Sequence, residues 1–88
     1  MKFYYDVIET HCVEIDFQKI YNYIKSDDPD IKIIDVYNTF IDNVTFYLKS
    51  IYGCEDLEEE DNEYSINELI DSWGDWLDKI FGENWDEV

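Results

Sequence analysis

SINELIDSWGDWLDKIFG, residues 65–82, is the stretch of sequence that decides the fold of this chain. Ser65, followed three residues later by Glu68, forms a capping box, a pairing that satisfies free backbone N–H groups at a helix start. Gly82 is a typical C-terminal stop for the same helix. Between these signals the apolar residues recur at helical spacing and form one wide face: Ile66, Leu69, Ile70, Trp73, Trp76, Leu77, Ile80 and Phe81. The pattern predicts a long amphipathic helix with this face in the core.

The same helix is predicted to carry a row of carboxylates. Glu68, Asp71, Asp75 and Asp78 follow one another at intervals of three and four residues, so they share one side of the helix over about 15 Å. Like charges at these spacings repel each other by about 0.2–0.5 kcal/mol per pair. Lys79 is the only lysine near enough in sequence to relieve this repulsion. Stability alone would not select such a row, so we predict that it is a binding surface.

A second group of acids precedes the helix. Gly53 ends the preceding element, and residues 55–63 form an acidic loop that we expect to be too polar for burial. An EF-hand loop starting at Asp56 would require glycine at its sixth position and glutamate at its twelfth. The chain has Asp61 and Asn67 there, and it also lacks the ligands of a zinc site. We therefore predict no metal site and no cofactor.

Residues 31–52 follow a helical period but are rich in strand-favouring residues. Their apolar positions recur at intervals of three and four: Ile34, Tyr37, Ile41, Val44, Leu48 and Ile51. The β-branched and aromatic residues of this segment favour strands, and Asp42-Asn43 could turn a β-hairpin between residues 31–40 and 44–52. Because the polar positions keep the helical period too, we predict a helix, with the hairpin as the alternative.

The N-terminal part adds a strand and one more helix. Alternating aromatic and β-branched residues over positions 2–15 predict one bulged strand or a short hairpin. Asp16 is the expected cap of a helix that runs to about Ser26. Residues 27–30 are a predicted turn, with Pro29 at the first position of the next helix. The inward face of the first helix is expected to hold Phe17, Ile20, Tyr21 and Ile24.

Together these elements predict a small α+β, mostly helical fold. A strand or hairpin at the N-terminus would pack with about three helices in one acidic domain over residues 1–88. Residues 83–88 form a short tail that contains Trp85. Tryptophan is a preferred anchor residue at protein interfaces, so Trp85 is a candidate contact residue.

The charge of the chain excludes several classes of function. Its 88 residues contain 23 acidic side chains and 6 basic ones, for a formal net charge of -17, and none of the basic residues is arginine. Of this charge, -13 lies after residue 52. Binding to nucleic-acid phosphates or to anionic membranes needs lysine and arginine clusters, so we expect neither. No apolar run is long enough to span a bilayer, and residues 1–6 lack the apolar core of a signal peptide. We therefore expect a cytoplasmic protein. In that compartment Cys12 and Cys54 are expected to be reduced.

Catalytic patterns are missing from the sequence. His11 is the only histidine, and the three glycines do not form a phosphate-binding loop. The four serines do not occur in a nucleophile motif. Paired carboxylates have no diagnostic value among so many acids. We therefore predict that the chain is not an enzyme.

In its size, extreme acidity, lack of arginine, aromatic content and AT-biased composition, the chain resembles small phage-encoded inhibitors, particularly anti-CRISPR proteins and other DNA mimics. The resemblance implies a stoichiometric inhibitor that occupies the basic nucleic-acid channel of a Cas effector and blocks binding of DNA or recognition of the PAM. It implies no catalytic residues, and it places a phage-encoded chain in the cytoplasm of the host cell. The alternative is an immunity or antitoxin protein that neutralises a cognate basic nuclease toxin. A third hypothesis is an acidic phage or host adaptor protein without a nuclease target, whose charge only keeps it soluble.

The candidate partner-binding residues are the acids of the loop and of the helical row, together with the tail tryptophan. They are Glu55, Asp56, Glu58, Glu59, Glu60, Asp61, Glu63, Glu68, Asp71, Asp75, Asp78 and Trp85.

Overall fold

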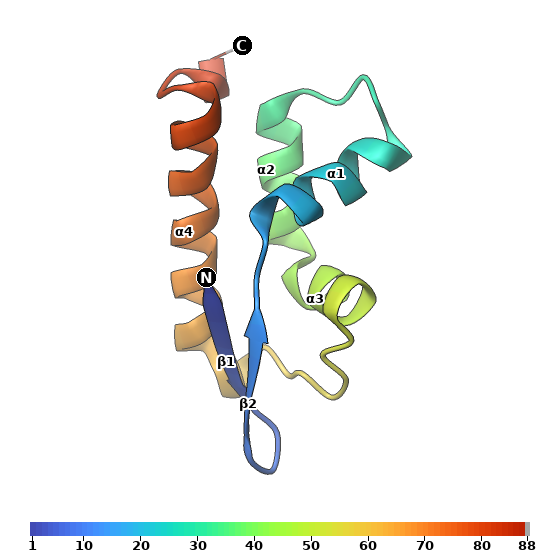
Figure 1. Cartoon of the computed structure of the whole chain (residues 1–88), viewed down its shortest axis with the longest axis vertical. Coiled ribbons are helices and arrows are strands. Elements are labelled where there is room, and N and C mark those ends of the chain that lie inside the picture. The colour runs from blue at the N-terminus through green and yellow to red at the C-terminus, as the bar shows by residue number, and fades with distance from the viewer. Residues whose placement is uncertain (88) are drawn as a thin grey trace.

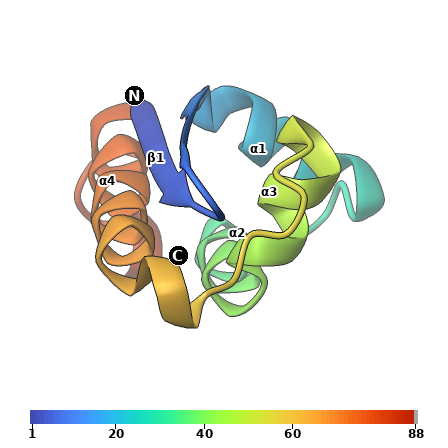
Figure 2. The same ribbon diagram turned by 90° about the horizontal axis from the view of Figure 1, so that it is seen from below.

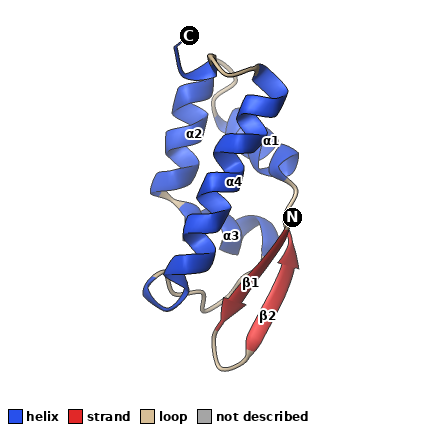
Figure 3. Ribbon diagram, turned by 90° about the vertical axis from the view of Figure 1, so that its left-hand side faces the viewer, coloured by secondary structure: helices blue, strands red, loops and turns tan. Residues whose placement is uncertain are grey.

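The computed structural model describes residues 1–87 as a β-hairpin packed with four helices, which confirms the predicted α+β, mostly helical class (Figures 1 and 3). The molecule is elongated, with extents of 42 × 24 × 20 Å. The longest helix, α4, lies along the long axis beside α2, with the hairpin near one end of the molecule (Figure 1). The elements are β1 (Lys2–Asp6), β2 (Thr10–Glu14), α1 (Phe17–Asp27), α2 (Ile33–Asp42), α3 (Val44–Tyr52), α4 (Glu63–Phe81) and the short 3-10 turns η1 (Glu60–Asn62) and η2 (Trp85–Glu87).

The N-terminal segment is a hairpin rather than one bulged strand. β1 and β2 pair antiparallel, with Phe3 opposite Val13 and Tyr5 opposite His11. Side chains alternate between the two faces of a strand, so Phe3 and Tyr5 enter the core while Tyr4 faces solvent. Viewed along the long axis, β1 lies between α4 and the side of the molecule that holds α1, α2 and α3 (Figure 2).

The first helix begins as predicted. The Asp16 carboxylate accepts a hydrogen bond from the Gln18 backbone N–H at 3.0 Å and caps α1. The helix ends at Asp27, one residue beyond the predicted end. The prediction that Pro29 starts the next helix is wrong, because Pro29 lies in the turn and α2 begins at Ile33. The ammonium of Lys25 donates to the carbonyls of Pro29 and Ile31 and so holds this turn in a non-helical path.

The middle segment is helical, so the hairpin alternative is wrong, but it forms two helices rather than one. Asn43, with φ -138° and ψ 35°, breaks the chain between α2 and α3. Each helix then turns its own face to the core. In α2 the buried residues are Val36 and Phe40, neither of which belongs to the predicted stripe, whereas Tyr37 is only half-buried. A single helical period carried across the break therefore missed the two most buried residues of α2, whereas Ile34, Tyr37 and Ile41 of the predicted stripe are partly buried and pack against the core.

The last helix begins before the predicted cap. The turn η1 leads directly into α4 at Glu63, so Ser65 lies inside the first helical turn and does not cap the helix. The C-terminal prediction is confirmed, since Gly82 follows the helix with φ +84° and its N–H donates to the Asp78 carbonyl at 2.9 Å. The positive φ explains why glycine occupies this position.

An aromatic cluster around Trp73 joins α1, α2 and α4. The Trp73 side chain is fully buried, and its ring lies 5.7 Å from Phe17 and 5.1 Å from Phe40. Trp76 stacks on it at 5.7 Å with an interplanar angle of 6°. The Trp73 indole N–H donates to the Tyr37 carbonyl at 3.4 Å. These contacts fix α2 against α4, which positions the surface described next.

Candidate functional site

The predicted row of carboxylates lies on the solvent side of α4. Glu68, Asp71, Asp75 and Asp78 are all exposed, and at 100° per residue they lie roughly opposite the inward face of the helix. That face is buried and holds Ile66, Leu69, Trp73 and Leu77. The amphipathic pattern that buries one side of α4 therefore necessarily presents the row on the other side.

The acidic loop is exposed at its carboxylates but anchored by buried residues, so the prediction that it is too polar for burial is wrong in part. Its seven predicted acids are exposed, whereas Leu57 and Asn62 are buried. The Asn62 side chain accepts a hydrogen bond from the Asp6 N–H at 2.6 Å and donates to the Asp6 carbonyl at 3.2 Å. It also donates to the Glu58 carbonyl at 2.9 Å. Through this amide, the loop is attached to the end of β1 and leads into the row on α4.

Lysines do not neutralise these acids. Within residues 1–86, the only ion pair joins the Met1 amino group to Glu14 at 3.1 Å. The ammonium of Lys25 binds backbone carbonyls, and that of Lys19 lies over the Tyr52 ring, 5.4 Å from its centroid. Carboxylates that no lysine of the chain neutralises can attract a positively charged partner.

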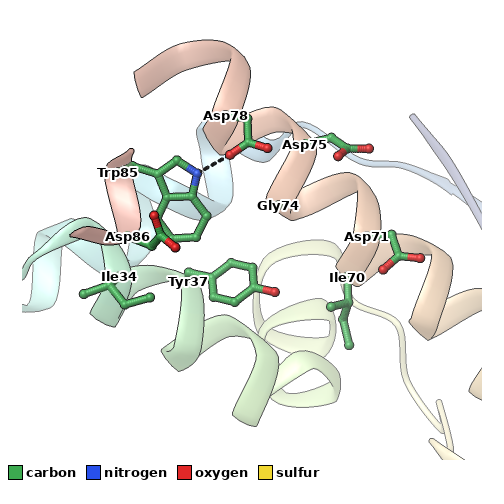
Figure 4. Close-up of a pocket in the computed structure, with 9 residues that line it drawn as sticks. All are labelled: Ile34, Tyr37, Ile70, Asp71, Gly74, Asp75, Asp78, Trp85 and Asp86. Atoms are coloured by element: carbon green, nitrogen blue, oxygen red, sulfur yellow. Dashed lines mark hydrogen bonds between the residues drawn. The ribbon is translucent and has the colours of Figure 1, made fainter. Parts of the chain in front are cut away.

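A groove of about 340 Å³ opens beside the row, between α4 and α2. Asp71, Asp75 and Asp78 are spaced along α4, and Asp86 comes from η2 beside Trp85 (Figure 4). The Tyr37 ring reaches into the groove from α2 (Figure 4). The other lining residues are Ile34, Ile70 and Gly74.

Trp85 closes one end of this groove. The residue is 8% exposed, its ring lies 5.1 Å from that of Tyr37, and its indole N–H donates to the Asp78 carboxylate at 2.5 Å. The predicted tail is thus folded back on α2 and α4 up to Glu87, and Val88 lies outside the described residues. Trp85 is therefore placed as an internal contact that orients Asp78, with little of its ring left for another protein.

Sequence reasoning did not identify the groove itself. Asp86 and Tyr37 belong to separate elements, and only the folding back of η2 brings them together. One signal was present: Gly74 lies inside a strong helix, where glycine often marks the close approach of another element. A Cβ atom at Gly74 would lie 3.6 Å from Cε1 of Tyr37.

The remaining reactive groups do not gather at the row or the groove. Cys12 is exposed and Cys54 is buried, and both are free thiols. Burial raises the pKa of the Cys54 thiol, while a hydrogen bond with Tyr5 partly opposes this effect. On α4, the interaction with the Glu68 carboxylate raises the pKa of the Tyr64 hydroxyl. Among the described residues, no three histidine, cysteine or acidic side chains are grouped so that they could hold a metal ion.

Across the described part of the chain, every helix is too short or too polar to cross a membrane. No family model, curated protein or solved structure matches the chain.

Proposed function

We propose that this chain is a stoichiometric protein inhibitor that mimics the charge of nucleic acid, and that it acts as an anti-CRISPR on a DNA-binding Cas effector. The observation that carries the proposal is the exposed set of acids along α4 and its preceding loop, none of which is paired with a lysine within residues 1–86. Such a surface costs stability in the free protein. Binding to a strongly basic partner, which supplies the missing cations, would offset this cost.

The density of charge supports this proposal. B-DNA carries one negative charge per about 1.7 Å of helix axis, so about 25 charges over a length of 42 Å. The chain places a formal net charge of -17 on a body of that length, about two-thirds of the DNA value. A field of this strength speeds association with a basic cleft and weakens with added salt.

The proposed mechanism is displacement by occupancy. Cas effectors hold nucleic acid in a basic channel, and in the Cas9 type arginines read the PAM through paired hydrogen bonds to guanine. Carboxylates accept the same paired hydrogen bonds from arginine. The row on α4 and the loop before it would bind those basic residues in place of phosphates and bases, and bound DNA and inhibitor would exclude each other.

A second candidate function is an immunity or antitoxin protein that neutralises one nuclease toxin. The groove between α2 and α4 favours it, because a shaped pocket lets an acidic protein select a single basic partner. The electrostatic mechanism is the same, and the two candidates differ in the partner.

The proposal is tested by capturing partners from host lysate on the immobilised chain and eluting them with duplex DNA or with a salt gradient. We expect a Cas effector to be retained at about 0.15 M ionic strength and to be released both by competing duplex and by salt. Capture of a toxin nuclease under the same conditions would favour the second candidate. Retained proteins that neither duplex DNA nor salt releases would contradict charge mimicry.

A further inference from the structure

The groove between α2 and α4 combines an acidic surface with an aromatic and aliphatic one. The α4 wall is acidic, with Asp71, Asp75 and Asp78, and η2 adds Asp86 beside Trp85. The other is aromatic and aliphatic, with Tyr37 and Ile34 from α2. At 340 Å³, the volume lies in the range of pockets that hold small ligands or protruding side chains.

Within the described part of the chain, side chains of the protein itself bind only one of the carboxylates that line the groove. Asp78 accepts the Trp85 indole hydrogen bond, whereas Asp71, Asp75 and Asp86 make no side-chain hydrogen bond or ion pair within residues 1–86. All of these carboxylates are exposed. The lining contains no basic residue. The charge that complements the groove must therefore come from another molecule.

We propose that this groove binds an arginine side chain of a basic protein partner. The inference deepens the proposed function and rests on it for the basic character of the partner. A guanidinium group would stack on the Tyr37 ring while its N–H groups donate to the carboxylates of Asp78 and Asp86. Its methylene stem would lie against Ile70, as the stems of long basic side chains do on apolar surfaces.

The geometry favours arginine over lysine. A planar guanidinium stacks on an aromatic ring and offers five donors in a fixed arrangement, whereas an ammonium is a compact and strongly hydrated charge. At the end of the groove closed by Trp85 the acceptors lie on two elements, with Asp78 on α4 and Asp86 on η2. One planar group with donors on several edges suits such a divided set better than a point charge.

The test is an NMR titration at about 0.15 M ionic strength with two probe peptides. Each is a flexible glycine-rich peptide, one with three arginines and the other with three lysines at the same positions. We expect the arginine peptide to shift the Trp85 indole N–H and the Gly74 amide selectively, and to bind about threefold more tightly than the lysine peptide. Equal affinities, or shifts spread evenly over all acidic segments, would overturn the proposal.

A groove-filling variant separates shape from charge. Gly74→Leu places a side chain in the groove and leaves every carboxylate in place, and Gly74→Ala is the control that adds only a Cβ. We expect Gly74→Leu to remove the selective shifts and the preference for arginine, and Gly74→Ala to keep both. Unchanged arginine binding by a folded Gly74→Leu variant would overturn the groove proposal. It would leave the charge mimic intact, because that function is tested separately, by reversing the carboxylates of the row.

Discussion

Replacing Asn62 by alanine should destabilise the protein strongly, although the residue lies next to a loop full of exposed acids. Asn62 is 5% exposed, and its side-chain amide makes three hydrogen bonds, two with the backbone of Asp6 and one with the Glu58 carbonyl. Each such bond contributes about 0.5–1.5 kcal/mol net, and partners left unpaired in a buried site add to the loss. We expect Asn62→Ala to lower the free energy of unfolding by about 2–4 kcal/mol. At 0.05–0.15 kcal/mol per residue, a chain of this length has about 4–13 kcal/mol in total.

The assay is urea unfolding followed by tryptophan fluorescence. With a slope of about 1–3 kcal/mol per molar urea, the midpoint should fall by about 0.7 M or more. Asn67→Ala is the matched control, because Asn67 is exposed on α4 and its side chain makes no hydrogen bond within the described residues. It should stay within about 0.5 kcal/mol of the wild type. An Asn62→Ala midpoint indistinguishable from that of the control would refute the assignment of Asn62 as the anchor of the loop.

Three further predictions concern α4, the tail and the core. Gly74→Ala should stabilise the protein by about 0.5–1 kcal/mol, because alanine favours the helix and its Cβ would make an ordinary contact with Tyr37; a lower thermal midpoint would contradict this. Trp85→Ala should cost about 1–3 kcal/mol through lost burial and should shift the Tyr37 ring resonances, and unmoved resonances would show that the tail is not docked there. Because burial holds the pKa of the folded Cys54 thiol above its ordinary value of 9.0, the folded state keeps a proton that the unfolded state releases. Stability should therefore be full below about pH 9 and fall as the pH rises above it, less so in Cys54→Ala; urea midpoints constant from about pH 8 to 10.5 would contradict the burial.

Helix ends that depend on only a few neighbouring residues could be predicted from the sequence. Asp16 caps α1 as its side chain predicts, and Gly82 ends α4 because only a residue that tolerates positive φ fits there. The row on α4 could be predicted for the same reason, since helical spacing alone places Glu68, Asp71 and their neighbours on one side.

The rest depended on contacts between distant segments. Nothing local to Asn62 indicates that its amide binds Asp6, 56 residues away, and this contact helps to place the start of α4. Trp85 could not be assigned either, because its partner Tyr37 belongs to α2 and the two meet only after the tail folds back. Asp42-Asn43 did indicate a turn at this position. The helical spacing of apolar residues on both sides of it nevertheless favoured one continuous helix, so the break between α2 and α3 was not predicted.

The most direct test of the central claim is displacement of DNA by variants that carry the same charge in different places. One variant reverses the row with Glu68→Lys, Asp71→Lys and Asp75→Lys. The control reverses three exposed acids elsewhere, Glu9, Asp27 and Asp30, to lysine, so both variants change the net charge equally. Fluorescent target duplex is bound to the purified effector, and each protein is titrated against it, with circular dichroism as the check on folding.

We expect the wild type to release the duplex at about one equivalent and the control variant to do so with a small loss. The row variant should need at least about tenfold more protein, because a tenfold loss corresponds to 1.4 kcal/mol and three charge pairs with the partner are replaced by repulsion. Equal displacement by the row variant and the wild type would contradict the claim that the carboxylates of α4 take the place of nucleic-acid phosphates.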